Sequence, residues 1–197
     1  MLTLHHAPMS RSSRCLWLLE ELGADYRINY VDIRRMDGTG APDPSNPHPL
    51  KQAPALEHDG VVIIESIAII AYLTDLHPQA GMGPKVGDAD RAKYLSWLGL
   101  YSGVLEPAVT AKFRNPDGPS PQLEDAYQAL DAQWKAALEA NPYMLGERFS
   151  AVDILFGSLL QFFRQAMPPH AVYDDWVARV ADRPALARAR AKDARPQ

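Results

Sequence analysis

Short apolar runs alternate with polar turns in the N-terminal part of the chain. Leu2 to His6 has the pattern of a strand, and after a turn at Ala7-Pro8 the apolar residues between Cys15 and Leu22 fall on one face of a helix. Gly23 is expected to end that helix, because glycine tolerates the left-handed conformation common at helix ends. Tyr26 to Tyr30 then alternates as a strand does. This order predicts a parallel strand pair with a right-handed crossover.

Loop chemistry follows, and then a second set of strands. The segment from Val31 to Pro54 is rich in prolines and turn-forming residues, so we expect little regular structure there. Asp59-Gly60 divides two apolar runs between Ala55 and Ile64 and predicts a hairpin. A helix is expected from Ser66 to just before His77-Pro78. The order βαβ and then ββα predicts a thioredoxin-like sheet.

Strand patterns are absent from the remaining sequence. The segment from Pro78 to Gly87 is expected to be a linker, and Asp88 to about Arg114 predicts one long helix. Asn115 to Pro121 breaks that helix. Further helices are expected at about 122–140, 150–165 and 173–181, and from about residue 184. The predicted fold is an α/β thioredoxin-like domain at 1–78 and an all-α helical domain at 88–197.

Composition narrows the class of protein. With 197 residues, of which 47% are hydrophobic and 22% charged, the chain can bury a core. A net charge of −4 without runs of Lys or Arg argues against nucleic-acid binding. The most apolar segment, Val61 to Leu73, is shorter than the roughly 20 residues of a membrane span. The start of the chain lacks the features of a secretory signal, and the lone Cys15 can form no internal disulfide. We therefore expect a soluble cytoplasmic protein.

Serines gather where the first strand meets the first helix, between Pro8 and Arg14. A serine there can cap the helix, because its oxygen accepts a hydrogen bond from an unpaired backbone N–H. The same hydroxyls could instead contact a ligand beyond the end of the strand. The local pattern favours capping and leaves both interpretations open.

Four motifs together resemble the glutathione S-transferase family. They are a serine before the first helix, the Lys51-Gln52-Ala53-Pro54 run before the third strand, the Glu65-Ser66 pair at a helix start, and the segment from Gly146 to Ile154 in the helical part. Their order matches that of the family, and they span both predicted domains. The likeness is to serine-type, bacterial-like members, with local similarity to the zeta class.

The resemblance implies that Ser10, with Ser12 as its rival, donates a hydrogen bond to the sulfur of glutathione. A free thiol has a pKa of roughly 8.5, so its nucleophilic thiolate is scarce at neutral pH. Lowering that pKa by two units requires about 2.7 kcal/mol. One charge-assisted hydrogen bond, together with the N-terminus of the first helix, could supply this.

The resemblance also implies how glutathione, as co-substrate, would be held. A cis bond between Ala53 and Pro54 would let the Ala53 backbone pair with the cysteinyl part, while Gln52 reaches the glycine carboxylate and Lys51 lies beside it. Ser66 and the adjacent N–H groups would take the γ-glutamyl carboxylate, and Glu65 the ammonium. Read without the family, the same residues suit an ordinary trans proline and a helix start.

An apolar stripe on the long helix is the candidate pocket for the second substrate, a small apolar electrophile. The proposed pocket residues are Met9, Trp97, Tyr101, Leu105 and Phe113. We favour Tyr101 among them. A stripe at this spacing, which Tyr94 shares, also suits a core or a dimer contact.

Several other conspicuous residues have structural interpretations. Ser150 and Asp153 form an S-x-x-D capping box. Cys15 lies on an apolar helix face and is expected to be a core residue. His5 and His6 are expected in a strand and His48 in a loop, and no residues are spaced as metal ligands, so no metal is expected.

Together these features predict a homodimeric detoxification enzyme that conjugates glutathione to apolar electrophiles. Glutathione-dependent isomerisation of the zeta type is an alternative, because the run from Lys51 to Pro54 resembles that class. Against it, Ser10-Arg11-Ser12 replaces the Ser-Ser-Cys triplet of that class. A non-catalytic binding protein is a third possibility, which the intact Ser10 and Glu65-Ser66 motifs disfavour.

Overall fold

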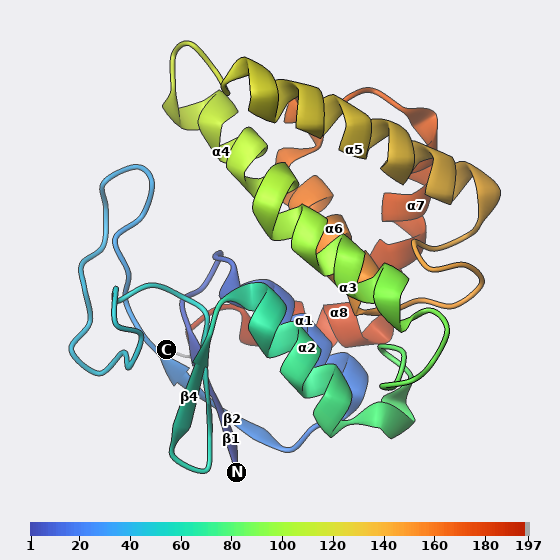
Figure 1. Cartoon of the computed structure of the whole chain (residues 1–197). Helices are drawn as coiled ribbons and strands as arrows, with labels where there is room; N and C mark the ends of the chain where they lie inside the picture. The colour runs from blue at the N-terminus through green and yellow to red at the C-terminus, as the bar shows by residue number, and fades with distance from the viewer. Residues whose placement is uncertain (196–197) are drawn as a thin grey trace. The chain divides into compact units, whose positions relative to one another are not determined.

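The computed structural model describes residues 1–195 and divides into two compact units (Figure 1). Unit 1 contains Met1–Met82 together with the described chain from Asp182 onward, and unit 2 contains Gly83–Ala181. Unit 1 holds the whole sheet, whereas unit 2 is helical. Each unit has its own buried apolar core.

A mixed four-stranded sheet forms the frame of unit 1. Its strands are β1 (Leu2–His6), β2 (Tyr26–Tyr30), β3 (Ala55–His58) and β4 (Val61–Ile64), in the order β2-β1-β3-β4. β1 and β2 are parallel, while β3 is antiparallel to both β1 and β4. The four predicted strands and the hairpin at Asp59-Gly60 are confirmed, with β3 ending at His58.

Helices α1 (Ser12–Leu22) and α2 (Ser66–Leu76) pack beside the sheet in unit 1. α1 buries most of its residues, and it ends at Gly23 with φ of 60°, as the sequence predicts. The chain between β2 and β3 forms no helix or strand, in agreement with its prolines and turn-formers. A short 3-10 helix, η1 (Pro78–Ala80), follows α2.

The last helix, α8 (Pro184–Lys192), also belongs to unit 1, where it packs against α1. The sequence predicts that the helical domain extends to residue 197, whereas α8 is part of the unit that holds the sheet. The reason is a set of ion pairs between α8 and α1: Arg188 Nε and Lys192 Nζ lie 2.9 and 2.5 Å from the carboxylate of Glu20. Arg183, just before α8, pairs with Glu21 at 2.6 Å.

Unit 2 begins with a long helical stretch that is not uniformly α-helical. α3 (Arg91–Leu100) and α4 (Glu106–Arg114) are joined by a π-helical turn, η2 (Tyr101–Leu105), where the sequence predicts a single helix. α5 (Pro121–Ala140), α6 (Ala151–Phe163), a short η3 (Arg164–Ala166) and α7 (Ala171–Ala181) complete the unit. None of the described helices is long and apolar enough to cross a membrane.

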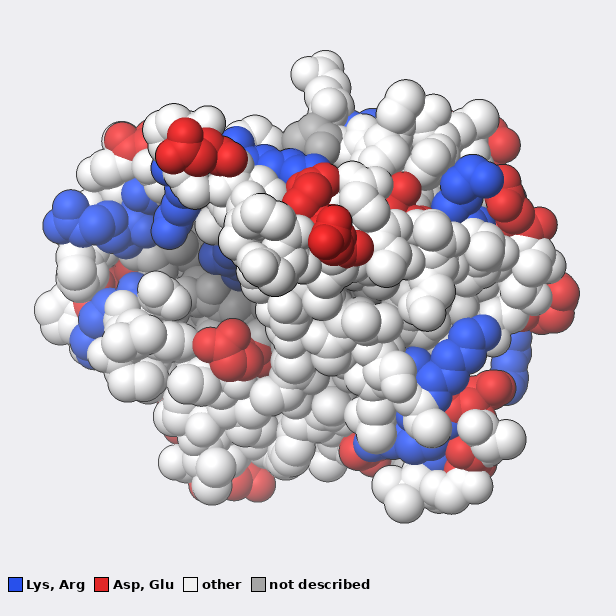
Figure 2. Space-filling view, turned by 45° about the horizontal axis from the view of Figure 1, so that its top comes forward, with Lys and Arg blue, Asp and Glu red and all other residues white. Residues whose placement is uncertain are grey.

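Aromatic side chains fill the core of unit 2. The indole ring of Trp134 contacts the rings of Phe156, Tyr173 and Trp176, with centroids 4.4–5.8 Å apart. At the start of α6, Asp153 accepts a hydrogen bond from the Ser150 N–H at 2.9 Å, so the predicted capping box is confirmed. Charged residues of both signs are interspersed over the face shown in Figure 2.

Candidate functional site

The predicted ligand segments of unit 1 meet at one end of its sheet. In the strand register, His5 of β1 is opposite Ala55, the first residue of β3, and Ala55 is opposite Ile64, the last residue of β4. The turn after β1, the segment before β3 and the start of α2 therefore leave the sheet at the same edge. Sequence motifs up to about 55 residues apart are brought together there by strand pairing alone.

Two serines in the turn after β1 differ in their access to solvent. Ser12 is completely buried, whereas Ser10 is partly exposed. Their hydroxyl oxygens lie 2.8 Å apart, and the Ser12 N–H donates to Ser10 Oγ at 3.2 Å. The preceding Met9 has 63% of its surface exposed, and Pro8 O accepts a hydrogen bond from Arg35 at 3.0 Å. Ser10 is thus the hydroxyl of this pair that a ligand can reach.

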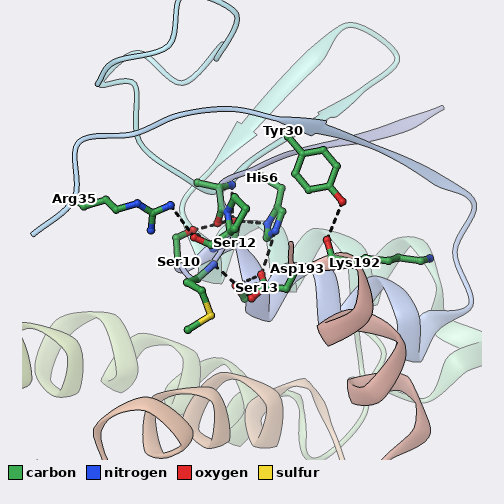
Figure 3. Close-up of polar contacts among 11 residues, drawn as sticks. His6, Ser10, Ser12, Ser13, Tyr30, Arg35, Lys192 and Asp193 are labelled. Carbon is green, nitrogen blue, oxygen red and sulfur yellow. Dashed lines mark hydrogen bonds and ion pairs between the residues drawn. The ribbon is translucent and has the colours of Figure 1, made fainter. Parts of the chain in front are cut away.

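Ser12 is held by residues at the end of β1 and in the turn that follows it (Figure 3). Its Oγ accepts from the Ala7 N–H at 3.1 Å and lies 2.7 Å from His6 Nδ1. Asp193, which follows α8, places Oδ1 3.1 Å from His6 Nε2, close enough for an ion pair although off the line of a hydrogen bond. Ser13 Oγ donates to the same carboxylate at 2.6 Å. No pattern in the sequence indicates that Asp193 belongs here.

The segment before β3 presents unpaired backbone at the same edge. The Ala53–Pro54 bond is cis, as the family resemblance implies. Within residues 1–195, the N–H and C=O groups of Ala53 have no hydrogen-bond partner, so they are available to an extended ligand. Gln52 is exposed and Lys51 is partly exposed.

A buried asparagine, which sequence reasoning overlooked, shapes this segment. Asn46 is fully buried; its Nδ2 donates to Gln52 O at 2.9 Å and its Oδ1 accepts from the His48 N–H at 3.0 Å. Lys51 Nζ donates to Asn46 O at 2.6 Å, which ties that lysine to the loop. The Asn46-Pro47 dipeptide, a common turn former, was the available signal.

The start of α2 supplies hydrogen-bond donors next to this loop. Ser66 is buried and Glu65 is exposed, and no side chain caps the helix. Burial lowers the pKa of His48, while the nearby carboxylate of Glu65 acts in the opposite direction. A carboxylate ligand would find the first N–H groups of α2 unpaired and the helix dipole favourable.

Backbone strain is concentrated in the same three segments. Met9, Lys51 and Glu65 have φ of 54°, 50° and 70°, a left-handed region that residues with side chains rarely adopt. Each of them lies in a different predicted ligand segment. The remaining such residue among those described is Asp59, in the hairpin turn. Strained backbone that gathers at one place is typical of a ligand site.

The other residues singled out in the sequence have different surroundings. Cys15 is buried, and burial raises the pKa of its thiol to about 12, so it is a core residue as expected. His5 lies in β1 beside Glu57 and Asn29. No group of potential metal ligands is found within residues 1–195.

The residues predicted to bind an electrophile differ in their exposure. Trp97, Tyr101 and Leu105 are buried in unit 2, where the first two rings contact Phe156 with centroids 5.6 and 5.3 Å apart. Phe113 remains 51% exposed. Tyr101 and Leu105 bound the π-helical turn, a feature frequent at functional sites. Met9 belongs to unit 1.

Two protein-family models match the chain. Residues 1–75 match the N-terminal domain of glutathione S-transferase, and residues 110–191 match its C-terminal domain. Together the matches include the turn after β1, the Ala53–Pro54 segment and the start of α2. Asp193 lies just beyond the second match.

Similar proteins span nearly the same length. Glutathione S-transferase 3 of Schizosaccharomyces pombe is 29% identical over 94% of this chain and 85% of its own. Maleylacetoacetate isomerase of Mus musculus is 24% identical over an alignment that covers 72% of this chain and 70% of the isomerase. A sphingomonad glutathione S-transferase, solved in complex with glutathione, has a TM-score of 0.77 at 25% identity. The match covers 97% of this chain and 98% of that structure's chain.

Proposed function

Because the chain belongs to the glutathione S-transferase family, we propose that it is a transferase which joins the thiolate of glutathione to a small apolar electrophile. The observation that carries this proposal is the convergence of three segments at one sheet edge. They offer Ser10, the unpaired backbone of Ala53, and the start of α2 at Ser66. These are a thiol partner, a strand-like edge and a carboxylate site, which match the parts of a tripeptide thiol.

Each part of glutathione has a proposed partner in unit 1. The Ala53 N–H and C=O pair with the cysteinyl backbone, and exposed Gln52 reaches the glycine carboxylate, with Lys51 nearby. Ser66 and the first N–H groups of α2 take the γ-glutamyl carboxylate. Glu65, exposed at the same helix start, takes the ammonium.

Ser10 is the proposed donor to the sulfur. Ser12 is completely buried, and its oxygen is already surrounded by Ala7, His6 and Ser10. A hydrogen bond to a charged group contributes about 1.5–3 kcal/mol, enough to lower the thiol pKa by roughly one to two units. The positive end of α1 adds to this effect.

The electrophile is proposed to be apolar. Met9, beside Ser10, exposes most of its surface and offers an apolar side chain next to the proposed donor to the sulfur. Replacing Met9 by a polar residue should therefore raise the KM for the electrophile without changing the affinity for glutathione.

Isomerisation is the second candidate, and the relation to the mouse isomerase favours it. In that reaction glutathione adds to the substrate and is released again, so no thiol is consumed. Conjugation consumes one thiol for each product. Thiol titration during turnover therefore separates the two reactions.

We further propose a cytoplasmic homodimer with a role in detoxification. The family resemblance supports the dimer, and a buried free thiol suits the reducing compartment where glutathione is abundant. Sedimentation equilibrium would test the dimer. A single species at the monomer mass would contradict it.

The proposed function is tested by calorimetry and by turnover. We expect one saturable glutathione site per chain and formation of a thioether with an activated aryl chloride such as chlorodinitrobenzene. Absence of any saturable glutathione binding would contradict the proposal. Binding with no conjugation, and no loss of thiol with any of a panel of electrophiles, would favour isomerisation or a binding role.

A further inference from the structure

A chain of polar groups runs inward from Ser10 and is not explained by binding of glutathione alone. Ser10 Oγ lies 2.8 Å from Ser12 Oγ, which lies 2.7 Å from His6 Nδ1 (Figure 3). The opposite ring nitrogen of His6 is 3.1 Å from a carboxylate oxygen of Asp193. The chain thus connects a partly exposed hydroxyl to a fully buried imidazole and then to an acid.

With His6 neutral, the hydrogens of this chain point inward. If Nε2 carries the ring proton and faces Asp193, then Nδ1 is an acceptor. It lies 2.7 Å from Ser12 Oγ and takes the single hydrogen of Ser12 in competition with the backbone oxygen of Ala7, which is 3.1 Å away. Ser12 Oγ, which also accepts from the Ala7 N–H, has room to accept from Ser10. The hydroxyl hydrogen of Ser10 is then used inside the protein. Its remaining lone pair is free to accept a proton from outside.

With a second proton on His6, the hydrogen bonds from Nδ1 to Ser12 and from Ser12 to Ser10 change direction, while Nε2–H still faces Asp193. Nδ1–H donates to Ser12 Oγ, whose hydrogen now points to Ser10. Ser10 Oγ accepts from the hydroxyl and from the backbone N–H of Ser12, so its own hydrogen turns outward. Both arrangements satisfy the donors and acceptors of the two serines. Only the second gives Ser10 a hydrogen to donate to a thiolate.

We propose that His6, paired with Asp193, accepts the proton of the glutathione thiol through Ser12 and Ser10. This inference rests on the proposed function. The S–H bond breaks and its proton binds Ser10 Oγ, while the proton of Ser10 moves to Ser12 and that of Ser12 moves to His6 Nδ1. A thiol and a neutral imidazole become a thiolate and an imidazolium. The same transfer leaves Ser10 donating to the new thiolate.

Asp193 is placed to stabilise that imidazolium. Its side chain is 15% exposed, and it is fixed by hydrogen bonds from Ser13 Oγ at 2.6 Å and the Met9 N–H at 3.4 Å. Tyr30 of β2 also packs against His6, and its ring meets the imidazole edge-on at 5.7 Å. A cation buried without a partner would be costly, so the acid makes the transfer feasible.

Tyr30 is itself held by the C-terminal segment. Tyr30 OH donates to the backbone oxygen of Lys192, and Arg195 donates to the Tyr30 carbonyl.

When the thiolate displaces an anionic leaving group, the thioether forms and the extra proton of His6 is released to solvent beside partly exposed Asp193. His6 and Asp193 act through the two serines and do not touch the sulfur, so they are positioning residues.

Nitrogen NMR of the His6 ring tests this inference on the unmodified protein. Saturation with glutathione at neutral pH should move the His6 ring nitrogens from the neutral pattern to the imidazolium pattern. S-methylglutathione, which has no thiol proton, should leave them neutral. An unchanged His6 with glutathione, or the same change with both ligands, would overturn the proposal.

A matched pair of variants provides an independent readout. Asp193→Asn keeps the shape of the side chain and removes its charge, so the pKa of bound glutathione should rise by about one unit, with turnover at neutral pH reduced about tenfold and recovered at high pH. Glutathione affinity should change less than twofold. Tyr30→Phe removes the bond to Lys192 but leaves the proton path intact, so its thiol pKa should stay at the wild-type value.

The outcomes separate this inference from the proposed function. Equal thiol pKa values in the wild type and Asp193→Asn would show that Asp193 only anchors the chain end. If Asp193→Asn fails to fold, the NMR comparison of the two ligands decides. If the wild type binds no glutathione at all, the proposed function itself is contradicted, and the relay with it.

Discussion

Ser10 and Ser12 are the same residue type two positions apart, and burial assigns them different roles. The oxygen of Ser12 is enclosed by Ala7, His6 and Ser10, and the residue has no exposed surface. Ser10 is partly exposed and accepts the Ser12 N–H. One serine therefore organises the turn while the other faces the ligand, a distinction that depends on the fold around them.

Ser66 is expected to contribute directly to glutathione affinity. Ser66→Ala should weaken binding at least tenfold, a loss of about 1.4 kcal/mol or more, because a carboxylate loses a hydroxyl donor at a helix start. Calorimetric titration measures this. Ser158→Ala, which removes a buried hydroxyl in unit 2, is the control and should bind normally. Undiminished affinity in Ser66→Ala would remove that residue from the site.

Cys15 is expected to be chemically inert in the folded protein. Burial raises the pKa of its thiol to about 12, so almost no thiolate exists at neutral pH. Iodoacetamide should leave the native protein unmodified and should alkylate Cys15 fully after denaturation. Mass spectrometry reports both states. Rapid alkylation of the native protein would show that the thiol is reachable and reactive.

At the scale of elements, the start of α6 depends on one buried carboxylate. Asp153 accepts from the Ser150 N–H, the Met144 N–H and Trp176 Nε1 at 2.9–3.1 Å, so it joins a helix cap to two other segments of unit 2. Asp153→Ala should lower the free energy of unfolding by about 2–3 kcal/mol, because buried donors lose their acceptor.

Ser120 gives the matched control for that cap. It caps α5 through a single bond of 3.3 Å at an exposed position, so Ser120→Ala should cost at most about 1 kcal/mol. Chemical denaturation of both variants compares them. Glutathione affinity of the folded protein should be unchanged in each. Equal stability of Asp153→Ala and the wild type would show that the cap contributes nothing.

The contact between α1 and α8 should make unit 1 sensitive to acid. Burial alone would raise the pKa of Glu20, but hydrogen bonds from Lys192, Tyr26 and Arg188 outweigh it and lower the pKa below its ordinary value. A lowered carboxyl pKa contributes stability above the unfolded-state value, and this contribution is lost as pH falls through the folded-state value.

Glu20→Gln should therefore destabilise the protein by about 1–2 kcal/mol at neutral pH, since its partners are half-exposed. The difference from the wild type should shrink below about pH 4, where the wild-type carboxylate is protonated as well. Urea denaturation at a series of pH values measures both. A difference that is constant with pH would mean that packing, rather than charge, is lost.

At the scale of the whole molecule, local sequence patterns predicted most helices and strands. They did not predict the contacts between residues that are far apart in the sequence. The strand from Leu2 to His6 and the helix from Ser66 have clear periodicity, and both boundaries are confirmed. The π-helical turn at Tyr101–Leu105 was not predicted, because one widened turn hardly alters an apolar stripe. The packing of α8 on α1 joins residues more than 160 positions apart, which no local pattern encodes.

The same distinction between local patterns and distant contacts applies to the residues of the site. Ser10, the Ala53–Pro54 pair and Glu65-Ser66 carry motifs, so a single sequence suffices to nominate them. Asn46 and Asp193 were overlooked because their roles come from buried hydrogen bonds to distant segments. His6 was placed correctly in a strand, but its neighbours at both ring nitrogens became visible only in the fold.

The central claim is that Ser10 stabilises the glutathione thiolate, and the ultraviolet absorbance of bound thiolate, followed against pH, tests it most directly. Ser10→Ala should raise the pKa of bound glutathione by about one to two units and reduce turnover at neutral pH about tenfold to a hundredfold, with partial recovery at high pH. Cys15→Ala, the control, should titrate as the wild type. A Ser10→Ala complex with the wild-type titration would contradict the account, and a shifted Ser12→Ala complex beside it would assign the role to Ser12.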